Sequence, residues 1–202
     1  MSELERWESR FSAPGYLFGD RPNAFLARQA DRLKPGMKAL CVADGDGRNG
    51  VWLAEQGLEV HSVDFSPTAL AKARVLATKR GVSIHTERAE LPTGWEWPTN
   101  AYDLVVGIFI QFSPPDEREI MFDNMKKALK EGGLLLIEGY GPKQLEYATG
   151  GPKKLDQLYT KDLLMEHFGE FFELTIEEYD QEVDEGEGHS GMSALVDLVG
   201  RK

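Results

Sequence analysis

The chain has 202 residues, of which 28% are charged, and its formal net charge is −11 at pH 7. This length fits a single α/β domain over residues 1–202 and leaves little room for a separate substrate domain. The acidic excess argues against a nucleic-acid partner, because a phosphate backbone is bound by a basic surface and no run of Lys or Arg here is longer than two.

The sequence contains no pattern for membrane insertion or secretion. Its first ten residues are charged and lack an apolar core, and no apolar run approaches the roughly 20 residues of a membrane helix. One cysteine, Cys41, allows no intrachain disulfide and suits a reducing compartment. We therefore expect a cytoplasmic protein without a membrane partner.

Helix starts are expected where a capping residue precedes a periodic apolar pattern. These starts lie at Asn23, near Arg48, at Ser66, after 113–115 and at Thr160. The helix from Asn23 is expected to bury Leu26, Ala30 and Leu33 and to stop at Pro35. The helix from Ser66 is expected to bury Leu70, Ala73 and Ala77. The helix after 113–115 is expected to bury Met121, Met125 and Leu129 and to end at 132–133. The helix from Thr160 is expected to end near Phe168.

Strand signals alternate with these helices. Apolar runs at 37–43, 104–109 and 134–137 are typical of parallel strands buried on both faces, and weaker strand signals lie at 60–63 and 83–86. Segments 172–179 and 193–199 alternate more strongly, and an acidic stretch at 177–188 joins them as a strand end and a solvated loop. The pattern predicts a Rossmann-like, doubly wound α/β/α fold, whose mostly parallel seven-stranded sheet ends in an antiparallel hairpin.

A glycine turn follows the first predicted strand. Gly45, Gly47 and Gly50 have the G-x-G-x-x-G spacing that lets backbone approach a ligand at a helix N-terminus. Asp64 follows Gly45 by nineteen positions, at the end of the next predicted strand. Because a carboxylate at that place can accept hydrogen bonds from both ribose hydroxyls, the spacing predicts a nucleotide site.

The charges in the turn favour one class of nucleotide. A dinucleotide pyrophosphate would lie against Asp44 and Asp46, unless Arg48 compensates for the like charges. The sulfonium and ammonium groups of S-adenosylmethionine instead favour nearby carboxylates, and its carboxylate can use the helix N-terminus near Arg48. S-adenosylmethionine is therefore the expected cofactor, and an NAD-binding oxidoreductase is the alternative.

The segments A-D-G-D-G-R-N-G-V-W-L-A-E-Q-G and V-D-F-S-P-T-A-L-A-K-A resemble the cofactor half of class I S-adenosylmethionine-dependent methyltransferases. Further segments resemble the branch with tellurite-resistance and thiopurine methyltransferases: Y-x-F-G-D-R-P-N-A-F-L at 16–26, A-E-L at 89–91, Y-D-L-V-V-G-I-F at 102–109, K-E-G-G-L-L-L-I-E at 130–138 and T-G-G-P at 149–152. The resemblance covers nearly the whole chain. It departs at Cys41, where the family usually has an acidic residue, and at Ala43, where it has a glycine, and these departures keep a non-enzymatic role of the fold open.

The resemblance and the topology rule for parallel sheets together assign the cofactor site. Its expected residues are Ala43, Asp44, Gly45, Asp46, Gly47, Arg48, Asn49, Asp64, Phe65, Glu90, Leu91 and Phe109. The resemblance implies that Phe65 packs on the adenine and that Glu90 or the Leu91 backbone meets its polar edge. Segment 1–22 is expected to be a lid over this site.

The methyl acceptor is expected to be a small molecule such as a thiol, a metalloid oxyanion or a nitrogen heterocycle. In-line transfer from a sulfonium depends mainly on alignment and exclusion of water, so the sequence assigns no catalytic acid or base. Acceptor-pocket candidates are Tyr16, Gln111, Tyr140, Tyr147 and His189, with Phe18 and Phe112 beside them. The resembling branch often has a histidine in place of Gln111.

Simpler interpretations remain for several of these residues. The aromatic candidates can be core residues, and His189 can be a solvated loop histidine. His61, His85 and His167 share no ligand spacing with each other or with Cys41, so no metal site is expected. A monomer or a homodimer is expected.

Overall fold

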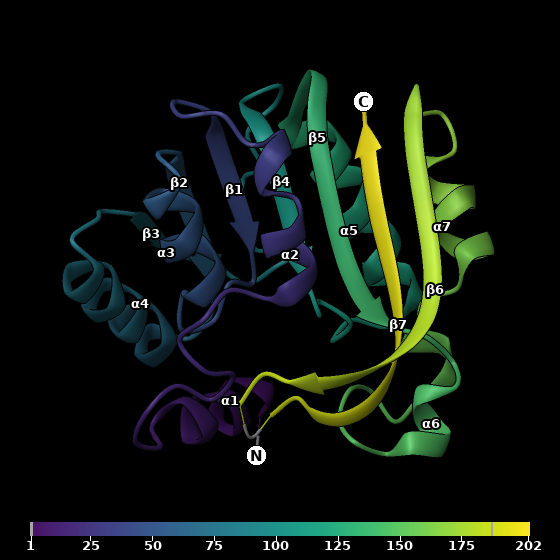
Figure 1. Cartoon of the computed structure of the whole chain (residues 1–202), viewed down its shortest axis with the longest axis horizontal. Helices are drawn as coiled ribbons and strands as arrows, with labels where there is room; N and C mark the ends of the chain where they lie inside the picture. Colours follow the sequence, from purple (N-terminus) through teal and green to yellow (C-terminus); the bar gives the residue numbers. More distant parts are fainter. Residues whose placement is uncertain (1, 187) are drawn as a thin grey trace.

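One mixed sheet forms the centre of the computed structural model, which describes residues 2–186 and 188–202 (Figure 1). In the described residues the strand order is β3-β2-β1-β4-β5-β7-β6. The strands are β1 (Lys38–Val42), β2 (Glu59–Asp64), β3 (His85–Arg88), β4 (Tyr102–Ile108), β5 (Leu129–Tyr140), β6 (Glu173–Asp184) and β7 (Ser190–Arg201). Strands β1 to β5 are parallel, and β7 runs antiparallel to both β5 and β6.

Helices cover both faces of this sheet (Figure 1). They are α1 (Glu3–Phe11), α2 (Ala24–Arg28), α3 (Arg48–Glu55), α4 (Pro67–Arg80), α5 (Pro115–Ala128), α6 (Gln144–Tyr147) and α7 (Lys161–Phe168), with short 3-10 turns at Ala30–Arg32 and Leu155–Gln157. Within the described parts of the chain, no helix is long and apolar enough to cross a membrane.

The apolar runs of the central strands divide between two cores because successive strand residues point to opposite faces. Leu104 and Leu136 pack with Phe25 of α2 and Leu53 of α3 on one face. On the other face, residues such as Val105 and Leu135 pack with α5 and α7. Burial on both faces is the reason that these strands are continuously apolar. The predicted three-layer fold with its C-terminal hairpin is confirmed.

Two helices differ in length from the sequence expectation. Asn23 does cap a helix, since its side chain accepts a hydrogen bond from the backbone N–H of Leu26. This helix ends at Arg28, however, and a 3-10 turn follows, so Ala30 is exposed rather than buried. The helix after Pro114 ends at Ala128, and Leu129 begins β5 by pairing with Tyr102. At Leu129, pairing in the sheet overrides the helical period, whereas Ala30 lies in an exposed 3-10 turn.

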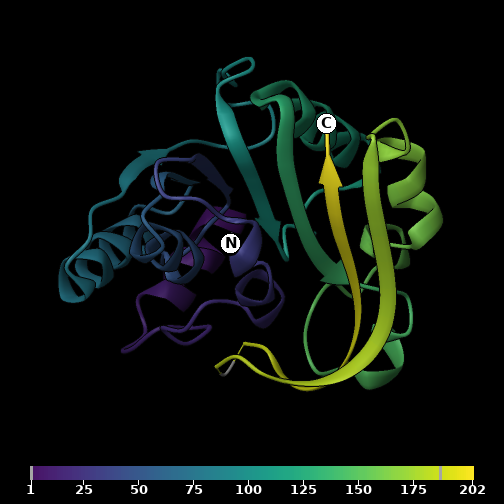
Figure 2. The same ribbon diagram turned by 45° about the horizontal axis from the view of Figure 1, so that its top comes forward.

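The hairpin of β6 and β7 extends far beyond the rest of the sheet. Its pairing runs from Glu173 with Arg201 to Asp184 with Ser190, and the ribbon curves toward the N-terminal segment (Figure 2). The backbone N–H of Gly188 donates to the carbonyl of Leu17 at 3.2 Å. The expectation of a solvated loop at 177–188 is therefore wrong for its end, because the Glu185 side chain is only 10% exposed.

Candidate functional site

The site lies at the point where the strand order reverses, between β1 and β4. The residues that follow these strands, Ala43 (φ 50°) and Phe109 (φ 55°), both adopt left-handed backbone conformations that L residues rarely use. Gly45 (φ 60°) and Gly47 (φ 87°) continue the turn. Strained backbone of this kind concentrates at functional sites, and a topological switch point is where open α/β sheets bind ligands.

Asp44 turns back beneath helix α3. Its Oδ2 accepts a hydrogen bond from the Ser62 hydroxyl at 2.8 Å, and its Oδ1 accepts one from the Gly50 backbone at 3.3 Å. A Cβ atom on Gly50 would lie only 2.5 Å from Oδ2 of Asp44, so the third position of the motif must be glycine to leave room for this carboxylate. Burial, together with the charges of Asp64 and Asp46, raises the pKa of Asp44 to about 7 against these hydrogen bonds. Its contacts tie the turn to β2 and α3.

Asp64 closes the glycine turn from the end of β2. Its Oδ2 accepts the backbone N–H of Gly45 and its Oδ1 that of Ser66, both at 2.9 Å. Burial raises the pKa of Asp64 to about 6 despite these hydrogen bonds. A carboxylate oxygen has two lone pairs, so each oxygen can still accept one hydrogen bond from a ribose hydroxyl. The residue therefore fits the predicted cofactor.

Helix α1 covers this turn. The Phe11 ring is buried against Gly45, where an added Cβ would lie 3.2 Å from Cζ of Phe11. The Glu8 carboxylate accepts hydrogen bonds from the Ser66 hydroxyl and from the Thr68 hydroxyl, the latter at 2.6 Å. Since Ser66 and Thr68 begin α4, the first helix is fastened to the same edge of the sheet that presents Asp64.

The N-terminal segment and the hairpin tip meet over the start of α3. Asp46 accepts the backbone N–H of Leu17 at 3.1 Å, and Asn49 accepts that of Asn23 at 2.9 Å. The Arg48 guanidinium donates to Glu185 at 2.7 Å, and both side chains are nearly buried. Burial alone would raise the pKa of Glu185, but His189 and the charge of Arg48 outweigh it and lower that pKa to about 2.

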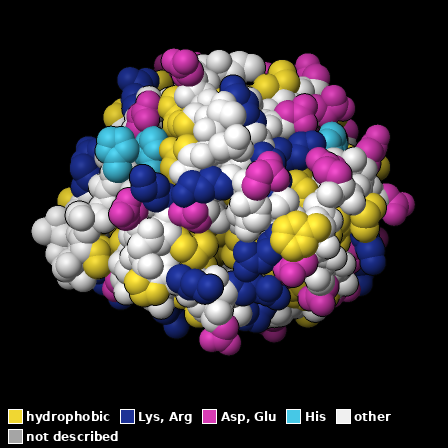
Figure 3. Space-filling view, turned by 90° about the horizontal axis from the view of Figure 1, so that it is seen from above, with side chains coloured by type: hydrophobic (Ala, Val, Ile, Leu, Met, Phe, Trp, Pro, Cys, Tyr) yellow, Lys and Arg dark blue, Asp and Glu magenta, His cyan; other side chains and the backbone are white. Residues whose placement is uncertain are grey.

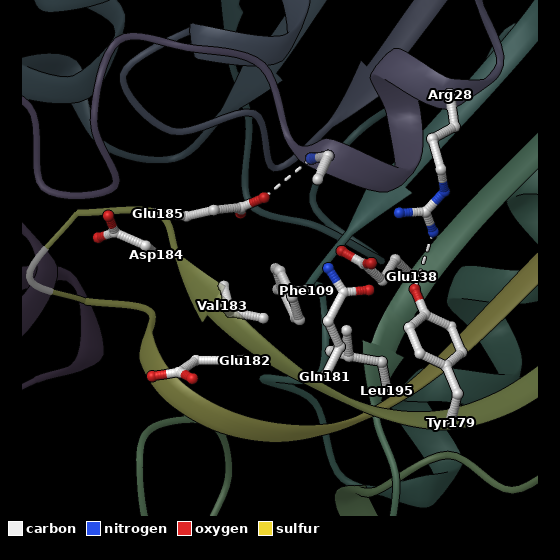
Figure 4. Close-up of a pocket in the computed structure, with 11 residues that line it drawn as sticks. Arg28, Phe109, Glu138, Tyr179, Gln181, Glu182, Val183, Asp184, Glu185 and Leu195 are labelled. Atoms are coloured by element: carbon white, nitrogen blue, oxygen red, sulfur yellow. Dashed lines mark hydrogen bonds between the residues drawn. The ribbon is translucent and has the colours of Figure 1, made fainter.

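A pocket of about 100 Å³ opens between α2 and the curved hairpin (Figure 4). Two carboxylates, of Glu138 and Glu185, point into it, and the cation Arg28 lies at one side (Figure 4). The lining consists of Ala24, Arg28, Phe109, Glu138, Tyr179, Gln181, Glu182, Val183, Asp184, Glu185 and Leu195. Glu138 is 2% exposed, and burial next to Asp197 and Glu185 raises its pKa well above the usual range. Phe109 joins this pocket to the turn at the switch point.

Three of the predicted site residues come together beside the pocket. The Phe109 ring centroid lies 4.6 Å from that of Tyr140 and 4.2 Å from that of His189, and Phe18 also contacts His189. His189 is buried rather than solvated, and burial lowers its pKa. Nδ1 of His189 and the hydroxyl of Tyr140 are buried without a hydrogen-bond partner in the described residues. Nδ1 of His189 faces Oε2 of Glu185 at 4.0 Å, so the histidine joins the aromatic cluster to the hairpin tip.

The other acceptor candidates lie elsewhere. Gln111 bridges backbone, because its Nε2 donates to the Tyr140 carbonyl at 2.9 Å and its Oε1 accepts the Tyr140 N–H at 2.6 Å. Tyr16 packs beside Val51 and Leu76. Tyr147, on α6, has the Lys143 ammonium over its ring.

The residues predicted at the adenine end follow β2 and β3. Phe65 is partly exposed, and its carbonyl accepts a hydrogen bond from Arg88 at 3.1 Å. Glu90 is exposed, and Leu91 is partly buried against the core. All three lie at the carboxyl edge of the sheet, and their contacts with adenine stay a prediction.

The sequence did not predict that the Asn23 side chain hydrogen-bonds two carboxylates, nor that Glu138 lines the pocket. Asn23 Nδ2 donates to Glu138 at 2.5 Å and to Glu185 at 3.2 Å, which links α2, β5 and the hairpin tip. A signal for Glu138 was present, since it is the single carboxylate that ends an otherwise apolar strand run. No local signal marks Glu185, whose side-chain hydrogen bonds from Ala24 and Arg48 span more than 130 positions.

Comparison with known proteins shows a similarity to methyltransferases over about half of the chain. Residues 39–133 match the family model described as a methyltransferase domain. The uncharacterized methyltransferase YbaJ of Bacillus subtilis is 29% identical over 105 residues, which cover 50% of this chain and 39% of YbaJ. The aligned part therefore spans less than half of that relative.

Solved structures extend the likeness to the whole chain. A protein studied for the conversion of a disulfide bond into a thioacetal group during echinomycin biosynthesis has a TM-score of 0.73 and 21% identity, covering 100% of this chain and 94% of the other. TehB from Haemophilus influenzae has a TM-score of 0.68 and 19% identity, covering 98% of this chain and 66% of TehB. At these identities the likeness establishes the fold. Residues 39–133 thus match a methyltransferase domain, and the chain as a whole shares the fold of these solved structures.

Proposed function

We propose that this chain transfers a methyl group from S-adenosylmethionine to a small molecule bound in the acidic pocket. The observation that carries the proposal is the position of that pocket: it adjoins Phe109, directly beside the glycine turn at the switch point. S-adenosylmethionine supplies an electrophilic methyl group when bound. The chain's own residues align the acceptor and exclude water, the two contributions that an in-line displacement needs most.

The cofactor would be held by the turn 43–49, with Asp64 accepting from the ribose and Phe65, Glu90 and Leu91 around the adenine. Asp46 and the N-terminus of α3 provide the opposite charges that the amino-acid end of the cofactor prefers. Because Phe11 covers Gly45 and Glu8 fastens α1 to α4, we propose that segment 1–22 is a lid which must open for the cofactor to enter.

The charge of the pocket supports a neutral or cationic acceptor. The carboxylates that face it are those of Glu185 and the buried Glu138, with the cation Arg28 at one side, whereas the Glu182 and Asp184 carboxylates point away from it (Figure 4). Arg28 is already paired with Asp197 at 3.1 Å and with the Tyr179 hydroxyl at 2.9 Å. Of the acceptor classes expected from the sequence, a nitrogen heterocycle or a thiol suits this lining, whereas a metalloid oxyanion would face like charges. The chain therefore resembles the tellurite-resistance branch in its fold, whereas its pocket does not suit an oxyanion acceptor.

Calorimetric titration with S-adenosylmethionine, S-adenosylhomocysteine and NAD⁺ tests the cofactor. We expect micromolar binding of the two adenosyl compounds and none of NAD⁺. Binding of NAD⁺ alone would overturn the proposal in favour of an oxidoreductase, and no binding of any of the three would favour a non-enzymatic role.

A panel of amines, nitrogen heterocycles, thiols and tellurite, assayed for S-adenosylhomocysteine release, tests the acceptor. Gln181→Lys places a cation on a side chain that points into the pocket and is expected to raise KM for a cationic acceptor several-fold without changing the affinity for cofactor. Lys153→Gln, an exposed charge change away from the pocket lining, is the control. Activity on tellurite alone would contradict the acceptor class while leaving the methyltransferase assignment intact.

A further inference from the structure

Two histidines and one glutamate share a face of the β2–β3 edge, away from the acidic pocket. The parallel register pairs His61 with His85, and Glu87 lies two residues further along β3. Residues two apart on a strand point to the same side, so the register brings all three side chains together. One ligand atom from each residue lies within 4.8 Å of the others. Sequence spacing gave no metal motif here because the ligands come from two strands.

The two inner ligands of this cluster are oriented by outer hydrogen bonds. Nδ1 of His61 lies 2.7 Å from the Tyr102 hydroxyl, which leaves Nε2 as the free ring nitrogen. The Trp95 indole N–H donates to Oε1 of Glu87 at 2.9 Å, which leaves Oε2 free. Metal-binding histidines and carboxylates are typically held by partners of this kind, which fix the ring orientation and the tautomer.

The two free atoms face each other without a good hydrogen bond. Nε2 of His61 lies 3.0 Å from Oε2 of Glu87, yet it is shielded from solvent and has no hydrogen-bond partner among the described residues. When His61 is neutral with its proton on Nδ1, Nε2 of His61 and Oε2 of Glu87 present lone pairs toward the same point, as two ligands of one cation would. The neighbouring His85 ring, 4.5 Å from that of His61 between centroids, is exposed.

Solvent can reach this cluster from the surface. Figure 3 shows histidine side chains gathered at the left of the face seen from above, on the side where Figure 1 has β2 and β3. His85 lies exposed on the edge strand, so its side chain can rotate to admit an ion, whereas Trp95 holds Glu87 and His61 is fixed between Tyr102 and Trp95.

We propose that His61, His85 and Glu87 form a binding site for one divalent transition-metal ion of the zinc class. Two imidazoles and one carboxylate suit zinc, copper or nickel better than magnesium or calcium, which prefer all-oxygen sites. Three protein ligands leave a fourth position to water at the exposed side. The ion would join β2 to the edge strand β3, three residues before Asp64, and so brace the edge of the sheet that carries the cofactor carboxylate.

Titration of the metal-stripped full chain with zinc sulfate tests the site, with cobalt(II) absorption as a spectroscopic readout. We expect one ion per chain and the strong visible absorption of tetrahedral cobalt. His85→Ala and Glu87→Gln should each weaken zinc binding at least tenfold. Tyr102→Phe, which removes only the hydroxyl that orients His61, should weaken it about tenfold.

His167→Ala on α7 is the matched control and should leave zinc affinity unchanged. Circular dichroism in the absence of metal checks that each variant folds, and His85 is exposed enough for its substitution to be tolerated. The proposal is overturned if the wild-type chain binds no zinc, or if the ligand variants bind zinc as the wild type does. Cofactor titration of the same proteins is a separate readout, so failure of the metal site leaves the methyltransferase proposal untouched.

Discussion

Asp64 combines a structural and a binding role at one residue. Each of its oxygens accepts one backbone N–H, from Gly45 and from Ser66, so the carboxylate holds the glycine turn in shape. The second lone pair of each oxygen is directed to whatever occupies the turn. Asp64→Ala should therefore weaken S-adenosylhomocysteine binding at least tenfold in calorimetry. An unchanged affinity would remove Asp64 from the site.

The raised pKa of Asp64 also predicts how cofactor binding depends on pH. Ribose hydroxyls donate best to the ionised carboxylate, and burial raises the pKa of Asp64 to about 6. At pH 5 about one carboxylate in ten is ionised, so the affinity for S-adenosylhomocysteine should fall roughly tenfold between pH 7.5 and pH 5. Asp64→Asn should bind more weakly at neutral pH and show a flatter profile. A wild-type affinity that stays constant over this range would contradict the assignment.

Single residues show what the sequence could and could not predict about the site. The turn 43–49 and Asp64 are found from spacing because strand, turn and helix follow one another in the chain. Asn23, Glu138 and Glu185 meet only after folding, and their hydrogen bonds join residues 115 and 162 positions apart. Gln111 illustrates the converse, since its position after β4 was predicted but its side chain is engaged with the Tyr140 backbone.

Helix α1 is the element whose movement should control access to the turn. Glu8 fastens it to Ser66 and Thr68, and Trp7 stacks on Phe11 with ring centroids 5.5 Å apart. Glu8→Gln weakens this attachment, so the open form becomes more populated and cofactor association should become several-fold faster. Stopped-flow tryptophan fluorescence measures the rate. Glu5→Gln, on the same helix but paired only with Ser2, is the control; equal rates in all three proteins would argue against a lid.

The hairpin tip is the second element that closes over the site. Arg48 and Glu185 form its ion pair, and both side chains are shielded from solvent. Removing one partner of a buried pair costs about 3–5 kcal/mol, which here the chain can avoid by detaching the tip. Glu185→Gln should therefore increase hydrogen exchange at Gly188, whose N–H donates to Leu17. Exchange at Leu136, in the centre of the sheet, is the internal reference; unchanged exchange at Gly188 would show that other contacts hold the tip.

At the scale of the whole molecule, the alternation of strands and helices predicted the fold. Strands buried on both faces and a hairpin with stronger alternation leave few other arrangements. The curvature of the hairpin was not predictable, because the acidic stretch that forms its tip reads as solvent-exposed while Arg48 and Asn23 bind it from elsewhere. An acidic segment of a sequence is therefore not always exposed, because a cation from a distant part of the chain can pair with it in the folded structure.

Buried carboxylates also set the stability of the whole molecule as pH changes. Burial raises the pKa of Asp44 to about 7 from an ordinary value of 3.8, so the folded state binds this proton more tightly than the unfolded state. The resulting stabilisation is complete below pH 4 and is lost as pH rises through 7. A shift of about three units corresponds to at most about 4 kcal/mol.

Asp44→Asn isolates this contribution, since an amide can still accept from Gly50 or Ser62 but does not titrate. The free energy of unfolding of the wild type, minus that of the variant, should therefore fall by up to about 3 kcal/mol between pH 4.5 and pH 8. Urea unfolding at several pH values measures both. Taking the difference removes the opposing effect of groups such as Glu185, whose lowered pKa stabilises the fold above pH 4.5. A difference that rises with pH would mean that Asp44 stays ionised in the folded chain, with its charge stabilised by Ser62 and the start of α3.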